Sequence, residues 1–498
     1  MIPYQYFSFI IIGAIFLRLL PRLLSGTNIG ADHWFWNLYI ETYRNNRIFP
    51  PIISEYLLDE KQWYPPLFPL LISKLPKPIF DRLNFIIAIL IDILRMMLMM
   101  TLLWIFNKDI QIICIAGIIY GLTPMLISYN MQLNPRGLGA LFLDLLIVLI
   151  MIINQKSGPL WLWAIVSLLS GLILLTHKMT TQIFWFLCIA AGILLKEWIY
   201  FALIPTSMLI ALIISKGFYI NVLRAHWDIV TFWNRNWRKL QAHPIKESPI
   251  YGEPGYETPG KFHKKGIKGV LRHLFYLWGF NPSLWVLLFF CLLLLIISKN
   301  SHISNFDYWL LGWTFCITLF ALATTFLPVL KCLGGGYLYL YNAAFPSAIL
   351  ITLILEINKS YSVFVFIFVV SLIANLSVII SYYFKTSKRN TQSKDLEFDS
   401  AIEYLKNALP GVIMCLPFTF CDVIAYKTRK TVLFGAHGFG FKLLEPIFPV
   451  LLLPFSEIYK RYNVIYLLTI DSYLPQEIAK EIPFSEIIKF GKYTIYCR

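Results

Sequence analysis

Apolar runs of about 20 residues recur along most of the chain and are separated by short polar segments. A helix needs about 20 apolar residues to cross the hydrocarbon core of a bilayer, so each run predicts a membrane span. The pattern predicts about eleven spans, near residues 4–24, 82–106, 110–128, 136–153, 158–175, 179–195, 197–215, 277–298, 308–330, 335–356 and 361–384. No small-residue cleavage site precedes the "ADHW" segment, so we interpret the first run as a retained span.

The pattern changes after Tyr383, where a polar connector, "KTSKRNTQSKDLEFDS", begins. Beyond it, "FDSAIEYLKNALPG" has apolar residues at helical spacing, which predicts a helix. The runs "VIMCLP", "TVLFGAHG", "NVIYLLTI" and "YTIYC" are β-rich and bounded by turn residues. We therefore expect an α-helical polytopic membrane domain over residues 1–384 and a small soluble α/β domain over residues 385–498.

The composition agrees with a membrane protein, because 58% of the residues are hydrophobic and only 14% are charged. The net charge of +16 is scattered through loops and the tail, so we expect membrane lipids and lipid phosphates as partners and no nucleic acid. The eight cysteines form no CxxC pair. Three of them lie in the tail, Cys415, Cys421 and Cys497, and the sequence does not define any disulfide among them.

The short loops indicate the orientation in the membrane. If the N-terminus is cytoplasmic, each short cytoplasmic loop holds one lysine: Lys108, Lys156, Lys196, Lys299 and Lys359. The long loops over residues 25–81 and 216–275 and the C-terminal domain then lie outside. Nearly every unusual polar residue falls on that side. A transporter should instead distribute polar groups near the bilayer midplane, so the pattern favours an enzyme at the external surface.

The first external loop holds a single acid close to the membrane. Asp32 directly follows the first span, and "HWFWNLYIETYRNN" after it can form an amphipathic helix in the interface. That helix would offer Trp34, Phe35, Leu38 and Tyr39 to lipid. Farther along, "QWYPPLFPLLISKLP" contains Tyr64 and a rigid Pro-Pro turn. The structural alternative for Asp32 is a helix cap or a solvated loop acid.

This constellation resembles the GT-C superfamily of integral-membrane glycosyltransferases, which use polyprenyl-phosphate or polyprenyl-pyrophosphate sugars. The superfamily includes protein O-mannosyltransferases, the lipid A aminoarabinose transferase and the catalytic subunits of oligosaccharyltransferases. An acid near the start of the first external loop and a Tyr/Lys-Pro-Pro-Leu-type element near its end look like Asp32 and "WYPPLFP". Three later segments are similar in a weaker form: "NPRGLGALFLDLL", "LLTHKMT" and "GGGYLYLYNAAFP".

Two positions depart from the superfamily pattern. Many members have a second acid directly after the first, where this chain has His33. A requirement for a divalent cation, Mg or Mn, therefore stays open. The late segment lacks the usual Arg before its Tyr, although Lys331 lies just upstream.

The resemblance and the chemistry of glycosyl transfer together suggest roles for the candidate residues. A carboxylate near the membrane surface can take the proton of an acceptor hydroxyl, so Asp32 is the candidate general base. A guanidinium can bind a leaving phosphate through two bonds, so Arg136 is the leading phosphate ligand, supported by His177, Lys178 and Lys331. His33, Tyr64, Trp233 and Trp237 are the candidate substrate contacts. For the basic residues, anchoring at the membrane surface is the structural alternative.

Two other features of the sequence bear on the fold and the loops. Asp92 and Arg95 are three residues apart inside a span, which predicts a mutual ion pair, and we expect Asp144 to form an interhelical hydrogen bond. The segment "YGEPGYETPG" of the second long loop is rich in Pro and Gly and suggests a lid.

The sequence as a whole predicts an inverting glycosyltransferase that moves a sugar from a polyprenyl-phosphate donor to an envelope glycan, lipid or protein acceptor. We expect it in a prokaryotic cytoplasmic membrane, with its active site on the periplasmic or extracellular side. The alternatives are a lipid-linked glycan flippase or other transporter, and an O-antigen polymerase or ligase. The chain has no GxxxxGK, HExxH or GxSxG motif, which disfavours an ATP-driven pump and a serine hydrolase.

Overall fold

The computed structural model describes residues 2–25, 31–58, 61–155, 158–237, 266–297, 304–358, 360–391, 396–435, 441–447, 452–471, 474, 480, 482, 484 and 486–498. The chain divides into two compact units. The first comprises Met1–Thr27, Pro78–Tyr219 and Leu274–Arg389, and the second comprises Asn28–Lys77, Ile220–His273 and Asn390–Arg498.

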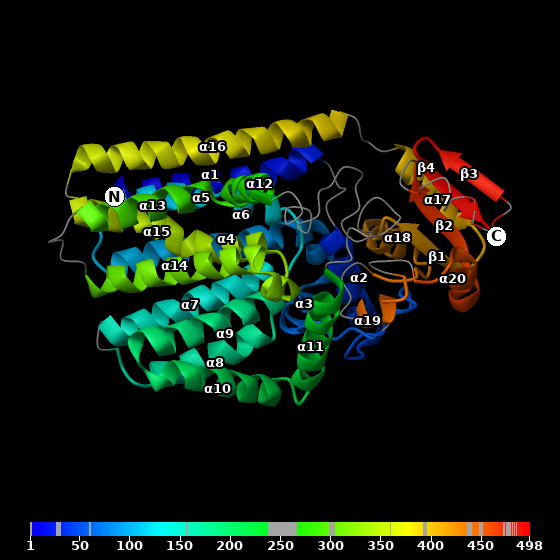
Figure 1. Cartoon of the computed structure of the whole chain (residues 1–498), viewed down its shortest axis with the longest axis horizontal. Helices are drawn as coiled ribbons and strands as arrows, with labels where there is room; N and C mark the ends of the chain where they lie inside the picture. The colour runs from blue at the N-terminus through cyan, green and yellow to red at the C-terminus, as the bar shows by residue number, and fades with distance from the viewer. Residues whose placement is uncertain are drawn as a thin grey trace. The chain divides into compact units, whose positions relative to one another are not determined.

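The first unit is a bundle of helices (Figure 1). Its long helices are α1 (Ile2–Ser25), α4 (Lys77–Ile105), α7 (Arg136–Gln155), α9 (Lys178–Leu195), α14 (Asn305–Phe326), α15 (Leu340–Asn358) and α16 (Tyr361–Thr391). Shorter helices are α5 (Ile110–Gly121), α6 (Pro124–Tyr129), α8 (Leu162–Leu174), α10 (Trp198–Ile214) and α13 (Pro282–Ile297). The 3₁₀ helices η3 (Pro328–Leu333) and η4 (Gly336–Tyr339) connect α14 to α15.

These helices confirm a polytopic helical membrane protein. Among the described residues, seven helices are long and apolar enough to cross a membrane, and three shorter apolar helices accompany them. The pair of α12 (Gly266–Phe280) and α13 is together long and apolar enough to cross a membrane, but the two helices meet at 102°, as in a broken span or a re-entrant loop. Each predicted apolar run overlaps at least one helix of the structure. The run over residues 110–128 is divided into α5 and α6 at Pro124, because proline suits the first position of a helix and not its interior.

The centre of the bundle is α15, which packs against α5, α13 and α14. In its membrane-crossing window 89% of the residues are buried, compared with 17% for α1 and 28% for α16. A helix that is apolar on all faces and buried on all faces belongs at the middle of a bundle. α1 and α16 therefore present most of their surface to lipid.

The second unit combines short helices with a four-stranded sheet. Its helices are α2 (Ala31–Asn46), α3 (Leu67–Ser73), α11 (Tyr219–Asn236), α17 (Leu396–Asn407), α18 (Cys421–Thr428), α19 (Phe441–Leu444) and α20 (Phe455–Tyr462). Its strands are β1 (Val412–Leu416), β2 (Val464–Ile470), β3 (Glu486–Phe490) and β4 (Tyr493–Cys497), in the order β1-β2-β4-β3. β1 and β2 are parallel, and the other two pairings are antiparallel. The small C-terminal α/β fold is thus confirmed.

The loop after α1 joins this C-terminal fold. Val432 forms parallel bridges both to Ile413 of β1 and to Tyr56 of the loop. Backbone bonds on this edge include Val432 N to Glu55 O (2.8 Å) and Leu57 N to Val432 O (3.0 Å). Of the predicted β-rich runs, "TVLFGAHG" forms no named strand in its described part, residues 431–435; instead Val432 links the first loop to the sheet through its two bridges.

Candidate functional site

Asp32 lies in the first turn of α2 and is half-buried. The N-terminal turn of a helix favours a carboxylate, because the backbone N–H groups there carry partial positive charge. One turn along the same face, the Trp36 ring packs edge-on against Tyr64 at 4.8 Å and lies 6.0 Å from the Phe68 ring on α3. The structure thus brings the acid-bearing turn and the "WYPPLFP" element together within the second unit.

The lipid-facing placement predicted for Phe35, Leu38 and Tyr39 of α2 is wrong, whereas Trp34, the fourth residue of that prediction, is half-buried. Phe35, Leu38 and Tyr39 are fully buried within the protein rather than offered to lipid. Phe35 stacks on Tyr56 at 6.2 Å, so partners far along the chain cover this face. His33 is also buried, and its ring meets Trp34 edge-on at 5.3 Å.

The basic candidates lie in the first unit, and Arg136 is the best defined of them. It is the first residue of the 20-residue helix α7, and its backbone N donates to Asn134 Oδ1 at 3.1 Å. Its guanidinium carbon lies 4.5 Å from the centre of the Tyr129 ring and 6.0 Å from that of Tyr341. Nε and Nη1 are buried and have no hydrogen-bond partner within the described part of the chain. The side chain therefore offers two N–H donors at a helix N-terminus, which suits an anion.

Small residues at the start of α7 explain its position. A Cβ on Gly137 would lie 3.3 Å from the Tyr341 hydroxyl oxygen, which itself donates to Asn130 Oδ1 at 2.8 Å. A Cβ on Gly139 would lie 2.7 Å from Thr180 Oγ1, so α7 approaches α9 closely. Buried His177 precedes α9, and Lys178 is its first residue. The glycines after Arg136 thus allow the starts of α7 and α9 to pack together.

Lys331 lies on η3 and is half-buried, with Nζ donating to Thr325 O. Burial lowers the pKa of Lys331 to about 8. The connection beyond it passes α9, because a Cβ on Gly334 (φ +116°) would lie 3.6 Å from Met179 Cε. The elements that carry Arg136, His177, Lys178 and Lys331 therefore adjoin one another at one end of the bundle.

The remaining predicted features are less closely defined. Trp233 lies half-buried on α11 with its ring edge-on to Phe232 at 5.2 Å, and Trp237 directly follows this helix. Their contact with substrate stays a prediction. The "YGEPGYETPG" segment, residues 251–260, lies outside the described residues. Within the described ranges, no group of three or more His, Cys, Asp or Glu residues could hold a metal ion.

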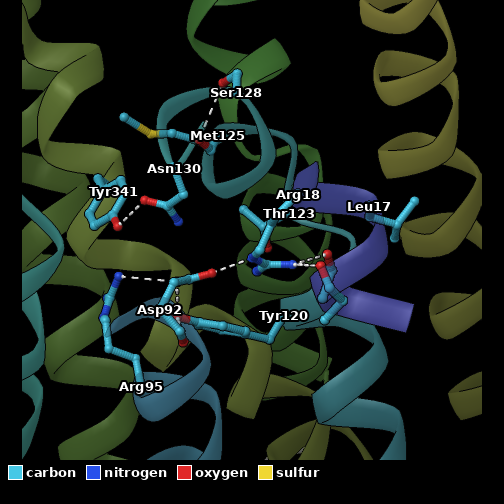
Figure 2. A network of polar contacts seen from close by, with 12 residues as sticks. Leu17, Arg18, Asp92, Arg95, Tyr120, Thr123, Met125, Ser128, Asn130 and Tyr341 are labelled. Atoms are coloured by element: carbon cyan, nitrogen blue, oxygen red, sulfur yellow. Dashed lines mark hydrogen bonds and ion pairs between the residues drawn. The ribbon is translucent and has the colours of Figure 1, made fainter. Parts of the chain in front are cut away.

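The structure also shows a charged network inside the bundle, of which Arg18 was not identified from the sequence (Figure 2). Arg18 Nε donates to Asp92 Oδ2, and the Tyr120 hydroxyl donates to Asp92 Oδ1 at 2.6 Å. Arg95 Nε donates to Asp144 Oδ2 at 2.7 Å. The predicted pair of Asp92 and Arg95 exists only as a longer contact of 3.9 Å. The sequence did contain a sign of this network, because Arg18 is a charged residue within the first apolar run, and charged residues are rare inside membrane spans.

This network extends to the neighbourhood of Arg136. The Arg95 guanidinium carbon lies 5.0 Å from the centre of the Tyr341 ring, the same ring that Arg136 approaches. The two arginine and two aspartate side chains are fully buried and balance in charge. Pairing the opposite charges with one another offsets part of the free-energy cost of burying them in the bundle.

No family model matches the chain, and no curated protein matches its sequence. Solved structures do resemble its fold. The oligosaccharyltransferase of Archaeoglobus fulgidus, in its apo form, matches with a TM-score of 0.59 at 12% identity, over 94% of this chain and 70% of that one. ArnT of Cupriavidus metallidurans, bound to undecaprenyl phosphate, matches with a TM-score of 0.56 at 9% identity, over 99% of this chain and 98% of that one. Both are GT-C membrane glycosyltransferases, and this chain has their fold.

Proposed function

We propose that this protein transfers a sugar from a polyprenyl-phosphate donor to an envelope glycan, lipid or protein acceptor, with inversion at the anomeric carbon. The fold supports lipid-linked sugar transfer in general. The observation that carries the proposal is Arg136, whose buried Nε and Nη1 lack partners in the described structure at the start of α7. ArnT, which has the same fold, is solved with undecaprenyl phosphate, and this supports a lipid-phosphate donor here. The oligosaccharyltransferase is solved with a tethered acceptor peptide, and this supports a separate acceptor.

The proposed reaction is a single displacement. Asp32 accepts the proton of the acceptor hydroxyl as its oxygen forms a bond to the anomeric carbon. The bond from that carbon to the phosphate oxygen breaks, and the phosphate leaves with the electron pair. Arg136 binds the departing phosphate, and His177, Lys178 and Lys331 add donors and positive charge. We assign sugar and acceptor contacts to His33, Tyr64, Trp233 and Trp237.

The proposed reaction has no step at a metal ion. The oligosaccharyltransferase was also crystallised with Zn and sulfate. The described residues of this chain offer no cluster of metal ligands that would correspond to such a site. For the cellular location, we propose a prokaryotic cytoplasmic membrane with Asp32 and the C-terminal domain on the external side.

The test uses purified protein in lipid nanodiscs and a panel of polyprenyl-phosphate hexoses and pentoses. Wild type, Asp32→Asn and the control Asp109→Asn, an exposed acid at the start of α5, are compared for donor binding and for sugar release or transfer. We expect Asp32→Asn to bind donor like wild type and to lose turnover by about 10²-fold or more. Unchanged turnover in Asp32→Asn would refute its role as the base. If wild type binds no donor, a lipid-linked glycan transporter becomes the better account, and lipid flipping is the assay that follows.

A further inference from the structure

Helix α18 of the C-terminal domain holds α2 from one side. The Tyr426 hydroxyl donates to Glu41 Oε1 at 2.8 Å, and the same tyrosine ring packs against Trp34 at 5.3 Å. Arg429, just after α18, donates to Glu41 Oε2. Lys427 Nζ lies 5.6 Å from the centre of the Trp34 ring. One turn of α18 thus contacts two points along α2.

The two points lie on one face of α2. Trp34 and Glu41 are seven residues apart, which is close to two full turns at 3.6 residues per turn. Asp32 lies two residues before Trp34, about 200° around the helix axis. The face that α18 contacts is therefore nearly opposite the side on which Asp32 lies. Contacts at two positions along α2, Trp34 and Glu41, fix both the rotation of the helix about its axis and its position along that axis.

Other contacts secure the same arrangement. On the Asp32 side, Trp36 packs against Tyr64, so α2 is held between α18 and the "WYPPLFP" element. At the start of α18, Asp422 accepts a 2.7 Å hydrogen bond from Tyr56, and both side chains are buried. The Tyr56 segment is in turn bonded to Val432. α18 is therefore anchored to the first loop at its start as well as through Tyr426.

We propose that α18 is a positioning element for Asp32, and that Tyr426 and Arg429 set the direction of its carboxylate without touching substrate. This inference rests on the proposed role of Asp32 as base. A general base must lie within hydrogen-bond reach of the proton it removes, and an error of about 1 Å in placement can cost about 10²-fold in rate. The Arg429 side chain is 45% exposed, so water screens its ion pair with Glu41. The contacts of Tyr426 therefore contribute more than this ion pair to fixing the position of α2.

The test compares Tyr426→Phe/Arg429→Gln with Tyr404→Phe/Lys406→Gln in full-length protein in nanodiscs. The control makes the same kinds of change in the same unit, where Tyr404 contacts Cys497 and Lys406 pairs with Glu403. We expect the first variant to lower kcat by about 10-fold to 10²-fold with the donor KM unchanged within about twofold. Amide hydrogen exchange over residues 31–46 should become faster in that variant alone. Tyr426→Phe alone should also lower kcat and speed amide exchange over residues 31–46, but by less. This single variant replaces the double variant in the test if the double variant does not fold.

The outcomes separate this inference from the proposed function. An inactive Asp32→Asn together with normal kcat and normal α2 exchange in Tyr426→Phe/Arg429→Gln would overturn the positioning role alone. An equal loss of kcat in the Tyr404→Phe/Lys406→Gln control would also overturn it, because the effect would then be a general destabilisation. A fully active Asp32→Asn would overturn the proposed base, and the positioning inference would fail with it.

Discussion

The Tyr56 hydroxyl donates a 2.7 Å hydrogen bond to Asp422 Oδ1, although 366 residues separate the two positions. Both side chains are buried. Burial, together with the charge and hydrogen bond of Asp422, raises the pKa of Tyr56 well above its ordinary value, so the phenol keeps its proton. The first loop and the C-terminal domain are thereby joined in their shared interior.

Replacing Tyr56 by Phe should lower the free energy of unfolding by about 1–3 kcal/mol, because buried Asp422 loses this donor. Since the folded-state pKa of Tyr56 is raised, its contribution is complete below the ordinary tyrosine pKa of about 10 and is lost as the pH rises further. The difference between wild type and Tyr56→Phe should therefore narrow above about pH 10. Thermal unfolding in nanodiscs measures both effects, with Tyr462→Phe as the control. Equal melting temperatures for wild type and Tyr56→Phe would contradict the prediction.

The pair of Arg95 and Asp144 allows a test of the intramembrane network. Among the described residues, Asp144→Leu leaves Arg95 with Asp92, at 3.9 Å, as its remaining carboxylate partner, and removing one partner of a buried pair costs about 3–5 kcal/mol. Arg95→Met/Asp144→Leu removes both charges and leaves the pair of Arg18 and Asp92 in place. We expect the double variant to unfold at a higher temperature than Asp144→Leu. If Asp144→Leu unfolded at the higher temperature of the two, Asp144 would not be needed to compensate the buried charge of Arg95.

The membrane helices were predictable because apolar runs of bilayer length depend only on local sequence. The partners of the buried charges were not, since Arg18 and Asp92 are 74 positions apart and Arg95 and Asp144 are 49 apart. The sequence did not identify strand β3, "EIIKF", because it is a short, mostly exposed edge strand whose apolar residues do not alternate regularly with polar ones.

In the candidate site, too, the sequence predicted features that depend on one segment but not contacts between residues far apart in the chain. Composition suggested that the aromatic residues of α2 meet lipid, whereas Tyr56 and Tyr64 cover them. A pattern within one segment cannot identify such partners. The glycines after Arg136 were visible as small residues, but their role in bringing α7 against α9 required the fold.

Arg136→Gln should weaken binding of undecaprenyl phosphate by about 10-fold to 10²-fold, because hydrogen bonds to charged groups contribute about 1.5–3 kcal/mol. Arg136→Lys should keep the positive charge but lose the second hydrogen bond to phosphate. Its affinity should therefore lie between those of wild type and Arg136→Gln. Native mass spectrometry of the complexes measures the affinities. Arg82→Gln, an exposed arginine near the start of α4, is the matched control. Unchanged affinity in Arg136→Gln would remove this residue from the phosphate site.

Lys331 predicts a pH dependence of the same binding. Burial lowers its pKa to about 8, so it is charged at pH 7 and neutral at pH 9.5 by this pKa. If it helps to hold phosphate, affinity for undecaprenyl phosphate should fall as the pH rises through about 8. Lys331→Arg keeps its charge across this range and should flatten the profile. The lowered pKa also means that protonated Lys331 costs stability, which should recover as the pH rises from about 8 toward the unfolded value of 10.5. An identical pH profile in Lys331→Arg would exclude its charge from donor binding.

The orientation of the chain is open to direct labelling. From the single lysines in the short loops we predict that the N-terminus lies in the cytoplasm, and an odd number of spans would then place the C-terminal domain outside. Single cysteines at Lys406 on α17 and at Glu197 between α9 and α10 compare two exposed sites. The background replaces the half-buried Cys114 and Cys332 with Ser, since the other six cysteines are buried. A membrane-impermeant maleimide added to intact cells should label Lys406→Cys at once and Glu197→Cys only after the membrane is opened. The opposite pattern would place the C-terminal domain in the cytoplasm, and an external acceptor would then no longer fit the proposed reaction.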